Sequence, residues 1–126
     1  MSKIKYELEY AINASTKLIY SRLSNPSGLS EWFADDVHLK GKNLAFIWDG
    51  TEQEAKIVIK KVNEYIRFKW VDDEDDESYF EFKITKDDLT NSVSLLITDF
   101  AENDELEDSK NLWDQQVNGL QRALGV

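Results

Sequence analysis

The sequence predicts an α+β domain in which a curved antiparallel sheet of about six to seven strands wraps around a long C-terminal helix. Three observations support this fold class. Apolar and polar residues alternate over residues 3–13 and again between residues 44 and 97, which is typical of half-buried strands. Turn signals separate these runs, and residues 106–124 carry apolar residues at helical spacing. We expect residues 1–126 to form a single domain, because a chain of this length supports one core.

The N-terminal part combines one strand with two short helices. The inward parity of the strand is apolar throughout and consists of Ile4, Tyr6, Leu8, Tyr10 and Ile12. Ser15 is the expected N-cap of the first helix, and the Asn25-Pro26 pair interrupts that helix. A second short helix is expected to follow, with a bulky apolar face made of Leu29, Trp32 and Phe33.

Residues 35–100 are predicted to form strands joined by short turns, which pair antiparallel when they follow one another directly. Asp49-Gly50 is a strong hairpin signal between a strand that ends at Trp48 and a partner over residues 52–62. The residues expected on the inward faces of the strands after this turn are Ala55, Ile57, Ile59, Ile66, Phe68, Trp70, Phe80, Phe82, Ile84, Val93, Leu95 and Ile97.

The final segment is predicted to be a helix of about 20 residues, which would be about 30 Å long. Its apolar stripe consists of Leu106, Trp113, Val117, Leu120 and Leu124. Asp104 and Glu107 have the spacing of a capping box, and Gly125 is placed as a C-terminal stop. Because a meander with one polar face must bury its other face, we expect this helix to cover the sheet.

Composition excludes several classes of function. The 25 acidic and 15 basic residues give a net charge of −10, which opposes binding to nucleic-acid phosphates and anionic membranes. The absence of cysteine and the single histidine, His38, argue against disulfides and against Cys or multi-His metal sites, so we expect no metal and no cofactor. No apolar run has the length of a membrane span, and the N-terminus has no signal-peptide core. We therefore expect a soluble cytoplasmic protein.

Two segments resemble a known family. A strand followed by Asn13-Ala14-Ser15 at a helix start, and then the segment Asn25-Pro26-Ser27-Gly28-Leu29-Ser30-Glu31-Trp32, is similar to the opening of the START-like superfamily, also called SRPBCC. Trp113, Leu120 and Leu124 on a final helix resemble the end of its branch related to the activator of heat shock protein 90 ATPase. The resemblance covers essentially the whole chain and implies the helix-grip fold.

This resemblance also implies a class of function. Members of the superfamily commonly enclose an apolar cavity between sheet and helix, and their ligands include lipids, sterols and polyketides. A few members are cyclases or hydrolases. Eukaryotic relatives of the branch activate a chaperone ATPase with an additional N-terminal domain, and the present sequence contains neither a matching segment nor an Asn-Asn-Trp-His-Trp stretch.

The candidate ligand-binding residues are large apolar side chains that the pattern directs toward the interior. They are Trp32, Phe33, Trp48, Phe68, Trp70, Phe80, Phe82, Trp113, Val117 and Leu120. Bulky rings inside a strongly curved sheet leave space for a small apolar ligand, unless they fill the interior completely. Gly119, within the final helix, either makes room for a ligand or a close strand or occupies a tolerated surface position, and we favour the surface position.

Four polar candidates have weaker support. Asp99 shares the inward parity, so it is either a buried general acid or base or, as we favour, a rim residue that binds a backbone N–H where the strand ends. His38 has the chemistry of a general base but no evident partner. Tyr6 and Tyr10 either present hydroxyls to a ligand or are core residues with satisfied tips. We assign no catalytic residue and favour a non-enzymatic function.

Two acidic clusters stand out. Asp72–Glu77 contributes six consecutive negative charges, and the second cluster consists of Glu102, Asp104, Glu105, Glu107 and Asp108. Neither has the ligand pattern of an EF-hand, so we expect Asp72–Glu77 to be a solvated hairpin tip. The alternatives are weak binding of a divalent ion and contact with a basic protein partner.

The sequence therefore favours a domain that binds a small, apolar or lipid-like molecule. One alternative is a protein-interaction or co-chaperone-like module that acts through the acidic surface. A second alternative is a cyclase or hydrolase. Ligand identity and oligomeric state are left open.

Overall fold

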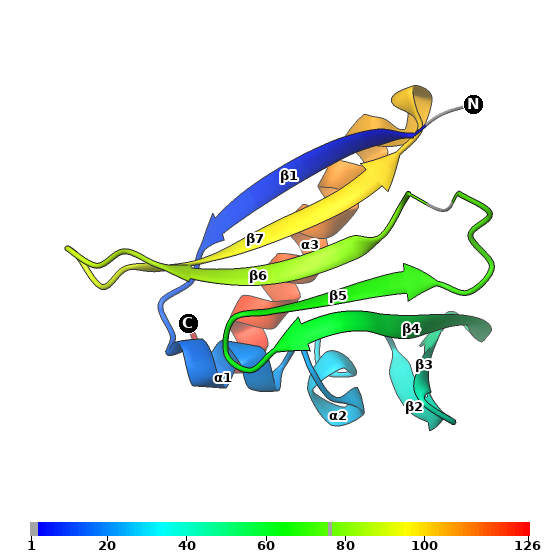
Figure 1. Cartoon of the computed structure of the whole chain (residues 1–126). Helices are drawn as coiled ribbons and strands as arrows, with labels where there is room; N and C mark the ends of the chain where they lie inside the picture. Colours follow the sequence, from blue (N-terminus) through cyan, green and yellow to red (C-terminus); the bar gives the residue numbers. More distant parts are fainter. Residues whose placement is uncertain (1–2, 76) are drawn as a thin grey trace.

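A seven-stranded antiparallel sheet curves around one long helix in the computed structural model, which describes residues 3–75 and 77–126 (Figure 1). The strands are β1 (Ile4–Ala11), β2 (Asp36–Lys40), β3 (Asn43–Trp48), β4 (Thr51–Lys61), β5 (Tyr65–Trp70), β6 (Phe80–Lys86) and β7 (Val93–Ala101). Their order in the sheet is β1-β7-β6-β5-β4-β3-β2. The predicted α+β helix-grip architecture is confirmed, with β1 closing the meander by pairing with β7.

Two short helices follow β1, as predicted: α1 (Thr16–Ser21) and α2 (Pro26–Leu29). The Ser15 side chain accepts a hydrogen bond from the backbone N–H of Leu18 at 3.1 Å, which confirms the expected N-cap. Proline is well tolerated in the first turn of a helix, where its missing N–H has no intrahelical partner. Pro26 accordingly begins α2.

The second helix is shorter than predicted. It ends at Leu29, so Trp32 and Phe33 lie in the turn that follows. The backbone N–H groups of Trp32, Phe33 and Ala34 all point to the Leu29 carbonyl, at 3.3, 2.8 and 3.4 Å, instead of stepping along successive carbonyls. This turn directs both aromatic rings into the core.

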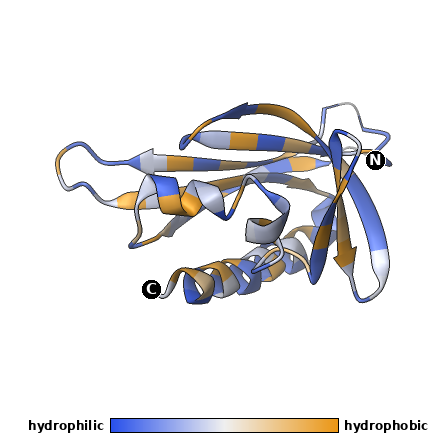
Figure 2. Ribbon diagram, turned by 90° about the horizontal axis from the view of Figure 1, so that it is seen from below, coloured by the Kyte–Doolittle hydropathy of each residue, from blue (hydrophilic) through white to orange (hydrophobic). Residues whose placement is uncertain are grey.

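The long helix α3 (Leu106–Leu124) lies across the concave face of the sheet and buries Trp113, Val117 and Leu120 (Figure 1). The hydropathy of the ribbon alternates along the strands, as expected for a sheet with one buried face (Figure 2). Across residues 3–75 and 77–126, no helix is both long and apolar enough to cross a membrane.

The two ends of α3 differ in how well they were predicted. Gly125 adopts the left-handed conformation with φ 77° and donates its N–H to the Arg122 carbonyl, which confirms the C-terminal stop. The predicted capping box of Asp104 and Glu107 is wrong, because the chain enters α3 through a 3-10 turn, η1 (Asn103–Glu105), without a side-chain cap. Acidic residues in the first turn still complement the helix dipole.

A bulge in β4 overturns one predicted core position. Ile57 pairs with Phe68 of β5, but Ile59 pairs with the next residue, Arg67, so one extra residue is accommodated in β4. The insertion reverses the parity of the strand beyond it. Ile59 is therefore 48% exposed instead of facing the core.

The buried ring of Phe33 connects the aromatic side chains of the core. Its ring stacks on Trp113 of α3 with a centroid distance of 5.7 Å and on Phe80 of β6 at 5.6 Å. It also meets the rings of Trp32, Phe46, Trp48 and Phe82. One residue of the turn thus links the helix to both halves of the sheet.

We predict that Phe33→Ala lowers the free energy of unfolding by about 3–5 kcal/mol, since it removes a buried ring and leaves a cavity. Leu89→Ala is the control, because Leu89 is 94% exposed, and we expect it to change stability by less than about 0.5 kcal/mol. Urea denaturation followed by circular dichroism measures both. Equal effects of the two substitutions would contradict the role of Phe33.

Two glycines differ in what surrounds them. A Cβ at Gly28 would lie 2.2 Å from the Ser21 carbonyl oxygen, so α1 and α2 approach each other too closely for any side chain there. A Cβ at Gly119 would lie 3.9 Å from the nearest Trp32 atoms, an ordinary contact distance. Of the two interpretations of Gly119, the tolerated position is therefore the one that fits.

We predict opposite signs for the same substitution at these two sites. Gly119→Ala should stabilise the domain by up to about 1 kcal/mol through its helix propensity. Gly28→Ala should destabilise it, because backbone atoms of α1 must move. The melting temperatures of the two variants measure the difference, and a stabilised Gly28→Ala protein would contradict the close approach.

Candidate ligand-binding site

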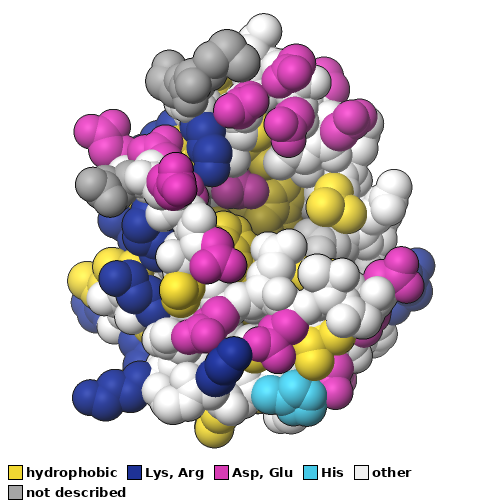
Figure 3. Space-filling model, turned by 90° about the vertical axis from the view of Figure 1, so that its right-hand side faces the viewer, with side chains coloured by type: hydrophobic (Ala, Val, Ile, Leu, Met, Phe, Trp, Pro, Cys, Tyr) yellow, Lys and Arg dark blue, Asp and Glu magenta, His cyan; other side chains and the backbone are white. Residues whose placement is uncertain are grey.

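A cleft of about 820 Å³ opens between the first half of α3, the turn over residues 30–35 and the sheet. Its aromatic lining consists of Trp32, Phe33, Trp48, Trp70, Phe80 and Trp113. On the side of the molecule that lies to the right in Figure 1, hydrophobic side chains lie in a hollow among acidic ones (Figure 3). The cleft is therefore a largely aromatic surface that is open to solvent.

The structure divides the ten sequence-predicted site residues into two groups. The six aromatic residues named above line the cleft. The other four, Phe68, Phe82, Val117 and Leu120, are at most 1% exposed and pack inside the core. The interior beneath the cleft is thus filled by side chains.

Asp99 is the polar group at the base of the cleft. It lies within β7, which continues to Ala101, so the prediction that the strand ends at Asp99 is wrong. Its Oδ1 accepts a hydrogen bond from the Phe100 backbone N–H at 2.7 Å. Its Oδ2 accepts one from Trp113 Nε1 at 2.9 Å and one from the Tyr6 hydroxyl at 3.3 Å.

Burial raises the pKa of Asp99 above the ordinary value of an aspartate. The three hydrogen bonds and the charge of Lys3 act in the opposite direction, because they favour the ionised form. The net effect is a raised pKa, as is common for carboxyl groups at functional sites.

The two tyrosines of β1 have satisfied hydroxyl groups. Tyr6 is hydrogen-bonded to Ser109 on α3 as well as to Asp99, and burial raises its pKa to about 12. The Tyr10 hydroxyl donates to Asp114 of α3 at 2.6 Å, and burial together with this carboxylate raises its pKa. Both hydroxyls tie β1 to α3 and keep their protons at neutral pH.

Several lining residues were missed by sequence reasoning. Ser109, Leu112 and Gln116 of α3 line the cleft beside Trp113. Their spacing of three and four residues from one another placed them on one helix face, so that signal was available. Glu31 and Asp35 were not identifiable from periodicity, because they lie in the turn where no regular pattern holds.

His38 lies away from this cleft. It projects from β2, where its Nε2 atom is 3.1 Å from Asp36 Oδ2, and both side chains are more than half exposed. His38 is not among the described residues that line the cleft. The imidazole thus forms a surface pair and is not part of the candidate site.

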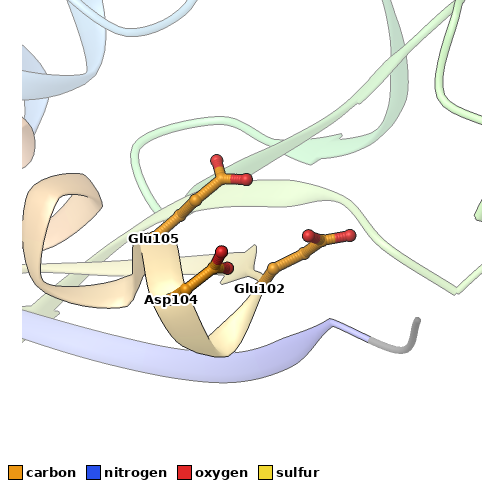
Figure 4. A group of neighbouring side chains, drawn as sticks. All are labelled: Glu102, Asp104 and Glu105. Atoms are coloured by element: carbon orange, nitrogen blue, oxygen red, sulfur yellow. The ribbon is translucent and has the colours of Figure 1, made fainter.

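The second acidic cluster lies where β7 passes into α3. Carboxylate oxygens of Glu102, Asp104 and Glu105 approach within 4.8 Å of one another (Figure 4). These groups surround the N-terminal end of α3, where negative charge is stabilised by the helix dipole. The helix terminus therefore explains their position.

The first acidic run is more structured than predicted. Asp76 lies outside the described residues, but the side chain of Asp73 is only 11% exposed and faces Lys3 at 3.4 Å. Asp73 also accepts hydrogen bonds from the Ser78 hydroxyl and the Asp75 backbone N–H. The expectation of a fully solvated tip is wrong for Asp73, since these donors anchor it.

The pKa of Asp73 reflects these contacts. Burial alone would raise it, but the hydrogen bonds from Ser78 and Asp75 and the Lys3 charge lower it overall. A carboxyl group whose pKa is lowered in the folded state stabilises the fold above its unfolded pKa of about 3.9. That stabilisation is lost as the pH falls through the folded pKa.

We therefore predict that Asp73→Asn lowers the free energy of unfolding at pH 7 by about 1–2 kcal/mol. The matched control, Asp72→Asn, removes the same charge from an exposed neighbour and should be neutral or slightly stabilising. Denaturation curves at pH 7 and at a pH below the folded pKa of Asp73 measure both. The Asp73 variant should approach the original protein in stability at the lower pH, and a difference that persists there would contradict the linkage.

A family model described as the START-like superfamily domain matches residues 1–126. The chain belongs to the START-like superfamily. This membership confirms the family resemblance of the N-terminal and C-terminal segments.

Solved structures resemble this START-like domain over nearly its whole length. BfR322 from Bacteroides fragilis is 42% identical, with 98% of this chain and 93% of that chain covered and a TM-score of 0.69. The Aha1 dimer from Colwellia psychrerythraea is 18% identical, with 96% of each chain covered and a TM-score of 0.81. MLL2253 from Mesorhizobium loti is 16% identical, with 97% of each chain covered and a TM-score of 0.80. No curated protein sequence is significantly similar.

Proposed function

We propose that this START-like domain binds a small, largely apolar molecule in the cleft between α3, the turn over residues 30–35 and the sheet. The observation that carries the proposal is the aromatic lining of a cleft of about 820 Å³. Ligand sites in proteins are typically concave, about 300–1,000 Å³ in volume, and lined by apolar side chains with a few polar groups.

The exposure of the indole rings supports this location. Trp48 and Trp70 are only partly buried, although both pack against the core. The Trp48 Nε1 atom donates to the Phe33 carbonyl at 2.8 Å, so its ring is held in place without a ligand. When a ligand displaces water from a preformed apolar wall of this kind, the free energy of binding becomes more favourable.

The filled interior limits how deeply a ligand can enter the domain. Phe46, Phe68 and Phe82 are completely buried, and ring pairs such as Phe68 and Phe80 stack with centroids 4.9 Å apart. The proposed ligand therefore lies in the open cleft above the aromatic core. The START-like fold commonly binds hydrophobic ligands, which agrees with this class of molecule.

The two alternatives have less support in the described residues. A cyclase or hydrolase would use Asp99, but the described lining of the cleft contains no His, Lys or Tyr to share a proton transfer with it. A protein-interaction module would use the acidic surface, yet Asp73 of the first acidic run is engaged within the domain.

We expect an uncharged apolar dye such as N-phenyl-1-naphthylamine to bind the folded protein with a dissociation constant in the micromolar range, which is about −8 kcal/mol. Binding should also quench tryptophan emission, because Trp48, Trp70 and Trp113 line the cleft. Dye fluorescence and tryptophan quenching are measured in one titration. Single Trp→Phe variants at positions 70 and 113 assign the quenching to individual rings.

Two exposed leucines supply a matched pair of variants for the same titration. Leu112 lines the cleft and is 55% exposed, whereas Leu89 is 94% exposed and lies outside the lining. Leu112→Gln should weaken dye binding about five- to tenfold, or roughly 1 kcal/mol, and Leu89→Gln should leave it unchanged. Absence of dye binding to the folded protein would overturn the proposed function.

A further inference from the structure

The charge of the cleft restricts the kind of apolar molecule that suits it. Three carboxylate residues, Glu31, Asp35 and Asp99, contribute to its lining. Within residues 3–75 and 77–126, no Lys, Arg or His contributes to it. Figure 3 shows acidic side chains around the hollow. An anionic ligand such as a fatty acid would therefore enter a negative site without a paired cation.

Asp99 retains capacity to bind a cation. An ionised carboxylate has about four acceptor positions, and the Phe100 amide, Trp113 and Tyr6 occupy three of them. All three neighbours donate to Asp99, and none accepts from it. Donors on every side suit a negatively charged carboxylate, and Asp99 is one of the residues that line the cleft.

The aromatic walls add attraction for positive charge. The rings of Trp48 and Trp70 have centroids 5.9 Å apart and planes inclined by 64°, so they form two sides of a corner. Phe80 lies 4.9 Å from Trp70, and Trp113 lies 6.5 Å from Phe80, but these two rings are only 1% and 5% exposed, so Trp48 and Trp70 are the partly exposed rings of the group. Indole and phenyl faces attract cations through their quadrupoles, and grouped rings of this kind recognise quaternary ammonium groups.

The cations near the cleft are engaged with other carboxylates. Arg22 forms an ion pair with Glu31 at 3.0 Å, which balances one of the three lining charges. Lys3 is close enough to Asp99 to lower its pKa, but its ammonium group pairs with Asp73 at 3.4 Å. Asp35 accepts a hydrogen bond from the Asp49 backbone N–H at 2.8 Å and belongs to the lining of the cleft.

We infer that the cleft selects an organic ammonium compound, an apolar body that carries a positively charged nitrogen, which binds Asp99 while its apolar part packs on Trp48 and Trp70. This inference rests on the proposed function and names the class of ligand. The aromatic rings supply contact area, and the Asp99 carboxylate selects a ligand with a positive charge.

A series of three probes with the same naphthylmethyl body tests the inference by titration calorimetry. The probes are (2-naphthylmethyl)trimethylammonium, its uncharged analogue with a carbon in place of the nitrogen, and 2-naphthylacetate. We expect the cation to bind at least tenfold more tightly than the uncharged analogue, and the anion to bind most weakly. Measurements at 0.15 M NaCl limit the general attraction of a chain with net charge −10 for cations.

Two substitutions that each remove one negative charge test whether Asp99 is the group that binds the cation. Asp99→Asn keeps the shape of the side chain and should weaken binding of the cation at least fivefold while changing the uncharged analogue less than twofold. Asp88→Asn is the control, because Asp88 is exposed in the turn between β6 and β7 and outside the cleft lining. It should leave the affinities of both probes within twofold of the original values.

The outcomes separate this inference from the proposed function. If the uncharged analogue binds as tightly as the cation, the ammonium selectivity is wrong while apolar binding stands. If none of the three probes binds, the proposed function itself fails. The comparison in the unsubstituted protein decides the selectivity even if Asp99→Asn does not fold, and an unchanged cation preference in folded Asp99→Asn would overturn the role of Asp99.

Discussion

The packing of Phe33 between sheet and helix is the constraint on which the rest of the structure depends. Its ring stacks on Trp113 of α3 and Phe80 of β6. Its carbonyl accepts hydrogen bonds from Trp48 Nε1 at 2.8 Å and Gln116 Nε2 at 3.0 Å. One residue in a turn thus fixes β3, β6 and α3 relative to one another, and these same elements form the walls of the cleft.

The cleft combines two features that oppose each other energetically. Its aromatic walls favour an apolar occupant, whereas Asp99 at its base is a carboxylate removed from most of the solvent. A buried charge is costly unless donors surround it, and Trp113, Tyr6 and the Phe100 amide supply them. The same groups hold the carboxylate in place, which is the preorganisation that the proposed ammonium site requires.

Local pattern predicted the elements of the fold well and their details less well. The alternation of apolar residues predicted the strands, and Ser15 and Gly125 marked helix ends that the structure confirms. The exposure of Ile59 was not predictable from alternation, because a single inserted residue in β4 reverses the parity. The anchoring of Asp73 by Lys3 joins residues 70 positions apart, which no local pattern encodes.

The sequence by itself determined the α+β class, the order of strands and helices, the family, the apolar inward faces and the net negative charge of the chain. Tertiary structure decided which aromatic residues line the cleft and which do not: Trp48, Trp70 and Trp113 contribute to its lining, while Phe68 and Phe82 are completely buried. A period of two identifies the inward face of a strand but not the depth of each side chain. Depth depends on the curvature of the sheet and on where α3 and the turn at Phe33 cover it, and both are set by contacts between distant segments.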